Sequence, residues 1–303
     1  MFHGFTFEDT LAASHKVGWQ IDDIIGGDKK LDFTKRFMPE SLARVEELDA
    51  LNDGERRLMN HIRGHEYLCI FGLVEEFILP FVLDHARPQL NSDDYRVRAF
   101  LQFASEEAKH IHLFKRFRDE FTKGFGQPCD VIGPGEAVAK EVLRHDPLAV
   151  ALVILHVEWM TQSHYIDSVR DNGELDPTFK SLLKHHWMEE AQHAKLDTLM
   201  VEALADGRDE ASILKAIEEY LEIGMFLDEG LRQQVQFNLT AFELATGWSF
   251  SDETREEIFT KQHQALRWTY LGSGMTHPKF RTTLGDLSPK AFARVEEVAP
   301  AFC

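Results

Sequence analysis

Two long segments of the chain contain neither glycine nor proline in their interior, and each begins with an Asp-Pro pair, Asp146-Pro147 or Asp176-Pro177. An aspartate caps the free backbone N–H groups at a helix start, and proline is favoured at the first helical position. Each segment ends near an Asn-Gly or Asp-Gly pair, which favours a turn. The pattern predicts two long helices joined by a short connection, over residues 147–171 and 177–205.

Two further long segments precede this pair. The first covers residues 55–87 and ends before Pro88, while Pro80 in its interior should bend the helix rather than end it. The second covers residues 93–123 and follows Asn91-Ser92, a good capping pair. Four long helices with two short connections predict an all-α fold built on a four-helix bundle.

The rest of the chain contains helical signals and loops. A Gly/Pro-rich loop at 124–135 separates the two helix pairs and indicates a crossover connection, and helical stretches at 209–245 and 252–271 precede a loop-rich tail. No β-rich segment and no clear linker is present in the sequence. We therefore expect one helical domain over residues 1–303, with a bundle at about 55–205, an N-terminal arm at 1–54 and a C-terminal helical extension at 206–303.

Charge and cysteine usage exclude several classes of protein. The formal net charge is −18 and no block of Lys and Arg occurs, which argues against nucleic acid or an anionic membrane as a partner. Three cysteines without paired spacing fit neither a disulfide framework nor a zinc finger. The longest apolar run, at 148–155, is too short to cross a bilayer, and the N-terminus lacks a signal-peptide pattern. We expect a cytoplasmic protein.

The motif Glu-x-x-His occurs once in each of two predicted helices, at Glu107/His110 within EEAKH and at Glu190/His193 within EEAQH. The first copy lies on an apolar face rich in phenylalanine, where an unpaired carboxylate would be costly. Each motif helix is preceded by a helix with a glutamate at a similar separation. Glu158 lies 32 residues before Glu190 and faces away from the polar side of its helix.

In the first helix, the polar stripe decides between two adjacent glutamates. We take the solvent-facing side of this helix to be the one marked by Arg56, Asn60, Arg63 and Tyr67. At about 100° per residue, Glu76 points about 170° away from the mean direction of that stripe, and Glu75 only about 90° away. Glu76 lies 31 residues before Glu107. We choose Glu76 and keep Glu75 as the alternative, since Pro80 could rotate the helix.

Four carboxylates and two imidazoles from four helices form the ligand set that holds two metal ions in the core of a bundle. The carboxylates nearly neutralise two divalent ions and hold them about 3.5–4 Å apart. Each imidazole adds one nitrogen ligand. Beyond these ligands, the sequence does not identify the catalytic residues, and we expect no site for an organic cofactor. The predicted ligands are Glu76, Glu107, His110, Glu158, Glu190 and His193.

Over about residues 55–205, this pattern resembles the ferritin-like di-metal carboxylate superfamily. His186 lies four residues before Glu190 and shares a helix face with Glu190 and His193. It resembles the extra ligand of the p-aminobenzoate N-oxygenase group of di-iron oxygenases. The alternative is that His186 donates a hydrogen bond to a ligand carboxylate. The resemblance implies two iron ions, with manganese as an alternative metal.

The resemblance also implies a function and its partners. We expect a di-iron oxygenase that uses O2 and an external electron donor to oxidise a small organic substrate, with N-oxygenation as the reaction typical of that group. The sequence leaves open whether the protein forms a homodimer. The alternatives are a ferritin-like iron-binding or ferroxidase protein and a manganese catalase-like enzyme. About 100 residues follow the predicted bundle and could wall a substrate pocket, which favours the oxygenase.

Overall fold

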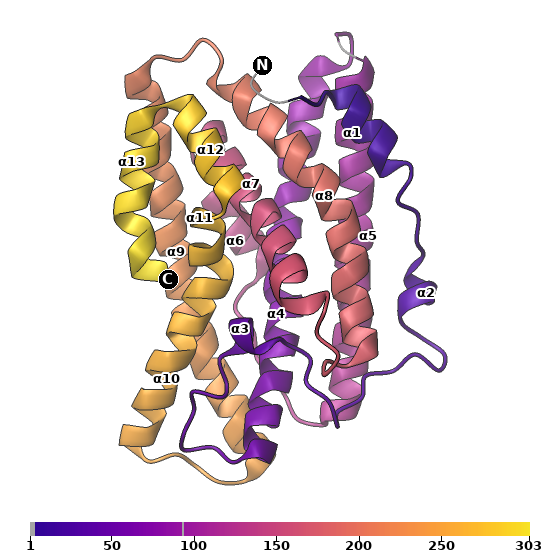
Figure 1. The fold of residues 1–303 in the computed structure, drawn as a ribbon, viewed down its shortest axis with the longest axis vertical. Coiled ribbons are helices and arrows are strands. Elements are labelled where there is room, and N and C mark those ends of the chain that lie inside the picture. The colour runs from indigo at the N-terminus through magenta and orange to yellow at the C-terminus, as the bar shows by residue number, and fades with distance from the viewer. Residues whose placement is uncertain (1–3, 93) are drawn as a thin grey trace.

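The computed structural model describes residues 4–92 and 94–303 and is built from helices (Figure 1). Within these residues there is no β-strand, only two isolated bridges between short loop segments. The predicted all-α fold is therefore confirmed. None of the described helices is both long enough and apolar enough to span a membrane.

Four long helices form the bundle. α4 (Asp53–Ala86) and α5 (Asp94–Phe125) are joined by the short 3-10 turn η1 (Arg87–Gln89), and they pack along each other. α7 (Pro147–Ser163) continues as the π-helical segment η2 (His164–Val169) and packs along α8 (Pro177–Ala205). α5 also contacts α8, which places the two helices that carry Glu-x-x-His side by side (Figure 1).

Side-chain caps fix the helix starts, as the sequence indicated for Asp146 and Asp176. The side chain of Asn52 accepts from the backbone of Glu55, whose own carboxylate closes a capping box at the start of α4. Asp146 and Asp176 cap α7 and α8, with a proline at the start of each helix. These caps satisfy backbone N–H groups that have no partner inside the helix. α4 runs through Pro80 without ending.

The N-terminal arm contacts more than one side of the bundle. It contains three short helices, α1 (Phe7–Ser14), α2 (Ile21–Ile24) and α3 (Glu40–Ala43). α1 packs against α5 and α8, the two motif helices (Figure 1). The arm buries Leu11 and Trp19 in the core and so belongs to the wall around the bundle interior.

The chain after the bundle covers the side formed by α4 and α7. α9 (Glu210–Thr246) packs against both α4 and α7. α6 (Gly135–Val142) lies in the crossover and packs against α4. α10 (Asp252–Arg267) packs against α9 and continues as the π-helical segment η3 (Trp268–Gly272).

The tail that we expected to be rich in loops is helical, so that expectation is wrong. It forms α11 (Ser273–Met275), α12 (Pro278–Leu287), α13 (Pro289–Val298) and the 3-10 turn η4 (Ala299–Phe302). Two of its prolines stand at helix starts. They occupy the first positions of α12 and α13, directly after the capping residues His277 and Ser288.

A buried carboxylate joins α9 to α10. Arg267 donates to both oxygens of Asp228, at 2.8 and 2.6 Å, and His263 lies 2.9 Å from one of them. Burial opposes the charge on Asp228, but the hydrogen bonds from Arg267 and His263 outweigh burial and lower its pKa to about 2. The negative charge of Asp228 therefore helps to hold the C-terminal helices on the bundle.

We expect Asp228→Asn to lower the free energy of unfolding at pH 7 by about 1.5–3 kcal/mol, the range for hydrogen bonds to charged groups. Because the pKa of Asp228 is depressed in the folded state, this stabilisation is complete above the ordinary aspartate value of about 3.9. It is lost as the pH falls toward 2. Urea unfolding at pH 7 and at pH 3 measures the difference, with Glu222→Gln on the same helix as the control. An equal difference at both pH values would contradict the assignment.

Candidate metal centre

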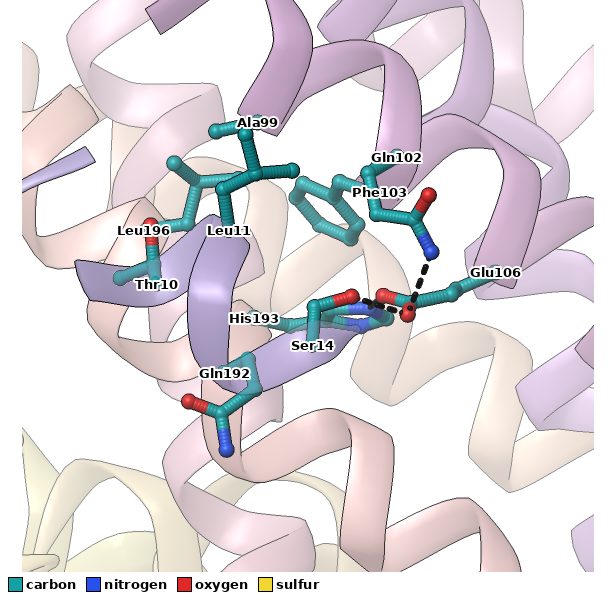
Figure 2. A pocket seen from close by; sticks show the side chains of 10 residues that line it. All are labelled: Thr10, Leu11, Ser14, Ala99, Gln102, Phe103, Glu106, Gln192, His193 and Leu196. Atoms are coloured by element: carbon teal, nitrogen blue, oxygen red, sulfur yellow. Dashed lines mark hydrogen bonds and ion pairs between the residues drawn. The ribbon is translucent and has the colours of Figure 1, made fainter. Parts of the chain in front are cut away.

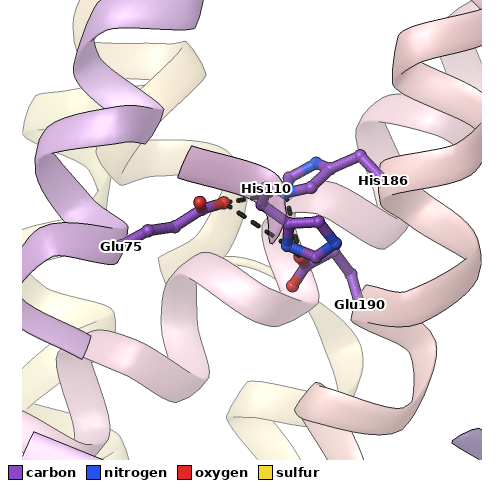
Figure 3. A group of neighbouring side chains, drawn as sticks. All are labelled: Glu75, His110, His186 and Glu190. Atoms are coloured by element: carbon purple, nitrogen blue, oxygen red, sulfur yellow. Dashed lines mark hydrogen bonds and ion pairs between the residues drawn. The ribbon is translucent and has the colours of Figure 1, made fainter. Parts of the chain in front are cut away.

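Six buried side chains in the bundle interior form two overlapping groups that could each hold a metal ion. The first group contains Glu75, His110, His186 and Glu190, and the second contains Glu107, His110, Glu190 and His193. Within each group the ligand atoms all lie within 4.8 Å of one another. Figure 3 shows Glu75 on α4 facing the three side chains of the first group that come from α5 and α8.

Glu190 is shared by both groups and offers one oxygen to each side. Its Oε1 lies 2.8 Å from Nε2 of His186 and 3.0 Å from Nδ1 of His110. Its Oε2 lies 3.2 Å from Nδ1 of His193. This places two imidazoles on one side of the Glu190 carboxylate and one on the other, which suits a carboxylate that bridges two cations.

Glu75 and Glu107 occupy the two outer ends of the cluster. Oε1 of Glu75 lies 3.1 Å from Nε2 of His186 and 3.6 Å from Nδ1 of His110. Oε1 of Glu107 lies 2.8 Å from Nδ1 of His193. Each end therefore pairs one carboxylate with the imidazoles that face the same oxygen of Glu190.

Glu158 on α7 lies beside the cluster. It is buried, with 2% of its surface exposed. Burial, and next the charge of the neighbouring carboxylate of Glu190, raise the pKa of Glu158 well above its usual value. A carboxylate held this close to Glu190 could extend the second group by one oxygen ligand.

Three inward-facing carboxylate oxygens of the cluster, among the described residues, are buried without a hydrogen-bond partner. Leaving a buried polar atom unsatisfied costs about 1–3 kcal/mol. Divalent cations bound between these atoms would satisfy them together, so the donor set fits two metal ions. The atoms are Oε2 of Glu75, Oε2 of Glu107 and Oε2 of Glu158.

The acid–base properties of the cluster show how it is balanced without a metal. Burial disfavours a charged imidazole, but the surrounding carboxylates raise the pKa values of His110 and His193 well above their usual range. Burial and the nearby Glu107 carboxylate raise the pKa of Glu75 to about 8. Protons thus take the place of cations, and metal binding must release them.

The choice of Glu76 as the inward residue of the first helix is wrong. Glu76 is exposed, and Glu75, the alternative, lies in the cluster. The polar stripe gave the wrong direction for solvent, because Arg63 and Tyr67 are buried rather than facing solvent. The N-terminal arm covers that side of α4: Asn60 accepts from the backbone of Phe37, and Arg63 donates to the backbone of Leu42.

The other predicted ligands lie together in the structure. The two Glu-x-x-His pairs meet at the centre of the bundle, with Glu158 beside Glu190. His186 faces the cluster, at hydrogen-bond distance from both Glu75 and Glu190. That position suits a ligand and also the alternative of a hydrogen-bonded neighbour, so the role of His186 stays a prediction.

Two carboxylates outside the groups hold the imidazoles in a crossed arrangement that we did not predict. Oε2 of Glu106 lies 2.9 Å from Nε2 of His193, and Oε2 of Glu189 lies 2.8 Å from Nε2 of His110. Each motif helix thus supplies the carboxylate for the imidazole of the other. The signal in the sequence was the doubled glutamate of EEAKH and EEAQH.

We call Glu106 and Glu189 the outer carboxylates. A hydrogen bond to the outer ring nitrogen leaves Nδ1 of each histidine free to face the cluster, the usual arrangement around metal-bound histidines. Burial opposes the charge on Glu106, but its hydrogen bond with His193 outweighs burial and lowers its pKa to about 2. The carboxylate of Glu106 therefore stays charged beside the imidazole that it orients.

The N-terminal arm supports both outer carboxylates. Ser14 at the end of α1 donates to Glu106, beside Gln102 and His193 (Figure 2). On the other side, Lys109 pairs with Glu189 and lies 3.8 Å from the centre of the Trp19 ring. The arm therefore positions the surroundings of the cluster and does not merely cover the bundle.

Asp197 is a further buried carboxylate that we did not predict. It lies one helical turn after His193, is fully buried, and has no hydrogen-bond partner for either oxygen within the described part of the chain. Burial raises its pKa well above the usual range. The sequence contains no motif around Asp197 that would have singled it out.

Comparisons with known proteins identify no close relative. No family model matches the chain, and no curated protein matches it. Among solved structures, an R2-like ligand-binding oxidase with an aerobically reconstituted Mn/Fe cofactor is 13% identical, with a TM-score of 0.44 over 87% of this chain and 92% of that one. A variant of such an oxidase with an Fe/Fe cofactor is 14% identical, with a TM-score of 0.45 over 88% and 93%. The likeness is distant.

Proposed function

We propose that this protein is an oxidoreductase that binds two iron ions and uses O2 to oxidise a small organic substrate. The observation that carries the proposal is the pair of buried groups that share His110 and Glu190, with inward carboxylate oxygens that have no hydrogen-bond partner. Two bound iron ions would supply the electrons that reduce O2, and an external donor would replace those electrons. Manganese at one or both positions is the alternative metal.

The chain's own residues divide between the two ions. Glu75, His110 and His186 face one oxygen of Glu190 and would hold the first ion. Glu107 and His193 face the other side and would hold the second, with Glu158 near enough to join. The outer carboxylates fix the imidazole orientations, and the burial of every ligand keeps bulk water away.

His186 motivates the finer form of the proposal, in which the enzyme oxidises a nitrogen atom of its substrate. A third imidazole gives the first ion a second nitrogen ligand without added negative charge. This agrees with the resemblance of the HHWMEEAQH segment to the p-aminobenzoate N-oxygenase group. The proposal of an oxidoreductase does not depend on this finer reaction.

Iron loading tests the proposal against its alternatives. Metal-free protein is given excess Fe(II) without oxygen, then exposed to air, and the iron that stays with the chain is measured. We expect two ions per chain, one for each group, and O2 consumption that continues only when a reductant is supplied. Iron uptake far beyond two ions would support storage. Rapid O2 release from hydrogen peroxide by the manganese-loaded protein would support a catalase.

A further inference from the structure

An apolar cavity of about 50 Å³ lies between α4, α7 and α9. Its lining includes Phe71 and Val74 of α4, Met160 of α7, and Leu227 and Leu231 of α9. About 10–15 Å³ suffices to hold one water molecule, whereas a cavity of about 150 Å³ takes up benzene. A ligand with one or two rings therefore needs more room than this cavity alone. The cavity lies on the side of α4 that α9 covers.

A wider recess of about 390 Å³ lies next to the cavity, between the crossover and α9. Ile132, Val138 and Leu227 line both spaces and so stand between them. Phe226, with 38% of its surface exposed, lines the recess but not the cavity. The recess therefore leads from the surface to the apolar cavity past a small set of apolar side chains.

A single ring separates the cavity from the candidate metal centre. Phe71 lines the cavity, and the centre of its ring lies 5.6 Å from the centre of the His186 ring. Phe71 is buried, and on α4 it lies one helical turn before Glu75. A molecule in the cavity would lie against the same ring that packs on the first metal group.

The lining determines the chemistry of a ligand. Among the described residues that line the cavity or the recess there is no Lys, Arg or His, and the acidic side chains Glu141 and Glu229 lie only in the recess. Tyr270 has the one polar side chain in the cavity lining, and its hydroxyl donates to Glu66 at 2.9 Å. An anionic ligand would lose its hydration without meeting a counter-ion, which is costly.

We propose that the cavity and the adjoining recess together bind the apolar body of the substrate, and that this substrate is an uncharged, hydrophobic small molecule that enters through the recess. That the bound molecule is a substrate rests on the proposed function, whereas the binding of an apolar molecule does not. Apolar contact holds such a ligand, since burial of apolar surface contributes about 25 cal/mol per Å². Phe71 is the side chain that divides the bound molecule from the metal groups.

The test measures binding to the metal-free, full-length protein, with the uncharged fluorophore 1-aminonaphthalene as the probe. We expect saturable binding with a blue-shifted, enhanced emission. Val74→Phe fills the cavity and Val138→Phe narrows the passage from the recess, so each should weaken binding at least tenfold. Leu101→Phe, at a position on α5 that is 47% exposed and lines neither space, is the matched control and should leave binding unchanged.

A second probe tests the charge preference. 1-Naphthalenesulfonate has the same ring system and a negative charge, and we expect it to bind at least tenfold more weakly. Equal affinities for the two probes, or unchanged 1-aminonaphthalene binding in a folded Val138→Phe protein, would overturn the inference. Val138 is only partly buried, so this variant keeps the test valid if Val74→Phe fails to fold.

The outcome separates this inference from the proposed function. If the protein takes up no iron but the cavity variants still weaken probe binding, the apolar site is supported and the proposed metal enzyme is refuted. If iron loading is normal but neither cavity variant changes probe binding, only the apolar site is refuted.

Discussion

Glu190→Ala should leave the protein unable to hold either metal ion and should abolish O2-dependent activity. Glu190 belongs to both groups, and its two oxygens face different imidazoles. Its removal therefore takes one ligand from each ion and the bridge between them. Glu75→Ala removes a ligand from the first group only, so that protein should retain about one ion per chain.

Glu76→Ala is the matched control for Glu75→Ala. The two glutamates are adjacent on α4, but Glu76 is exposed and outside both groups. We expect the Glu76 variant to bind metal like the unmodified protein. Elemental analysis after reconstitution with Fe(II) measures the ions per chain, and circular dichroism confirms that each variant is helical. Full metal content in Glu190→Ala, or equal losses in the two α4 variants, would refute the assignment.

The contrast between Glu75 and Glu76 shows that the sequence predicted where α4 lies but not which of its faces points inward. Helix starts could be predicted because capping is local, and Asp146 and Asp176 act within their own first turn. The inward face of α4 could not be found in this way. Its polar residues are buried, Arg63 against Leu42 of the N-terminal arm and Tyr67 against Tyr270 of η3, and nothing local to α4 reveals that cover.

The same limit applies to the surroundings of the cluster. Spacing within one helix placed Glu107 with His110 and Glu190 with His193, since residues three apart share a face. The outer carboxylates act between helices, and their partners depend on how α5 and α8 pack. The arm residues Ser14 and Trp19 lie even further away in sequence, so their contacts with the site could be seen only in the folded chain.

The crossed arrangement of the outer carboxylates predicts an effect that follows the partner rather than the helix. Glu106→Gln should lower the affinity for the ion on the His193 side, and Glu189→Gln should lower the affinity for the ion on the His110 side. Glutamine preserves the shape but removes the charge that orients the imidazole and makes it more basic. Loss of such a partner typically lowers metal affinity about 10–100-fold.

Double-mutant cycles separate the crossed arrangement from a simple effect within each helix. In a His193→Ala background, Glu106→Gln should cause little further loss of affinity, because its partner is already absent. In a His110→Ala background, the same substitution should retain its full effect. Anaerobic titrations with Co(II), followed by the visible absorption of the bound ion, measure each affinity. If Glu106→Gln instead coupled to His110, its neighbour on α5, the support would lie within each helix. The doubled glutamates would then reflect two copies of one local motif, not a connection between α5 and α8.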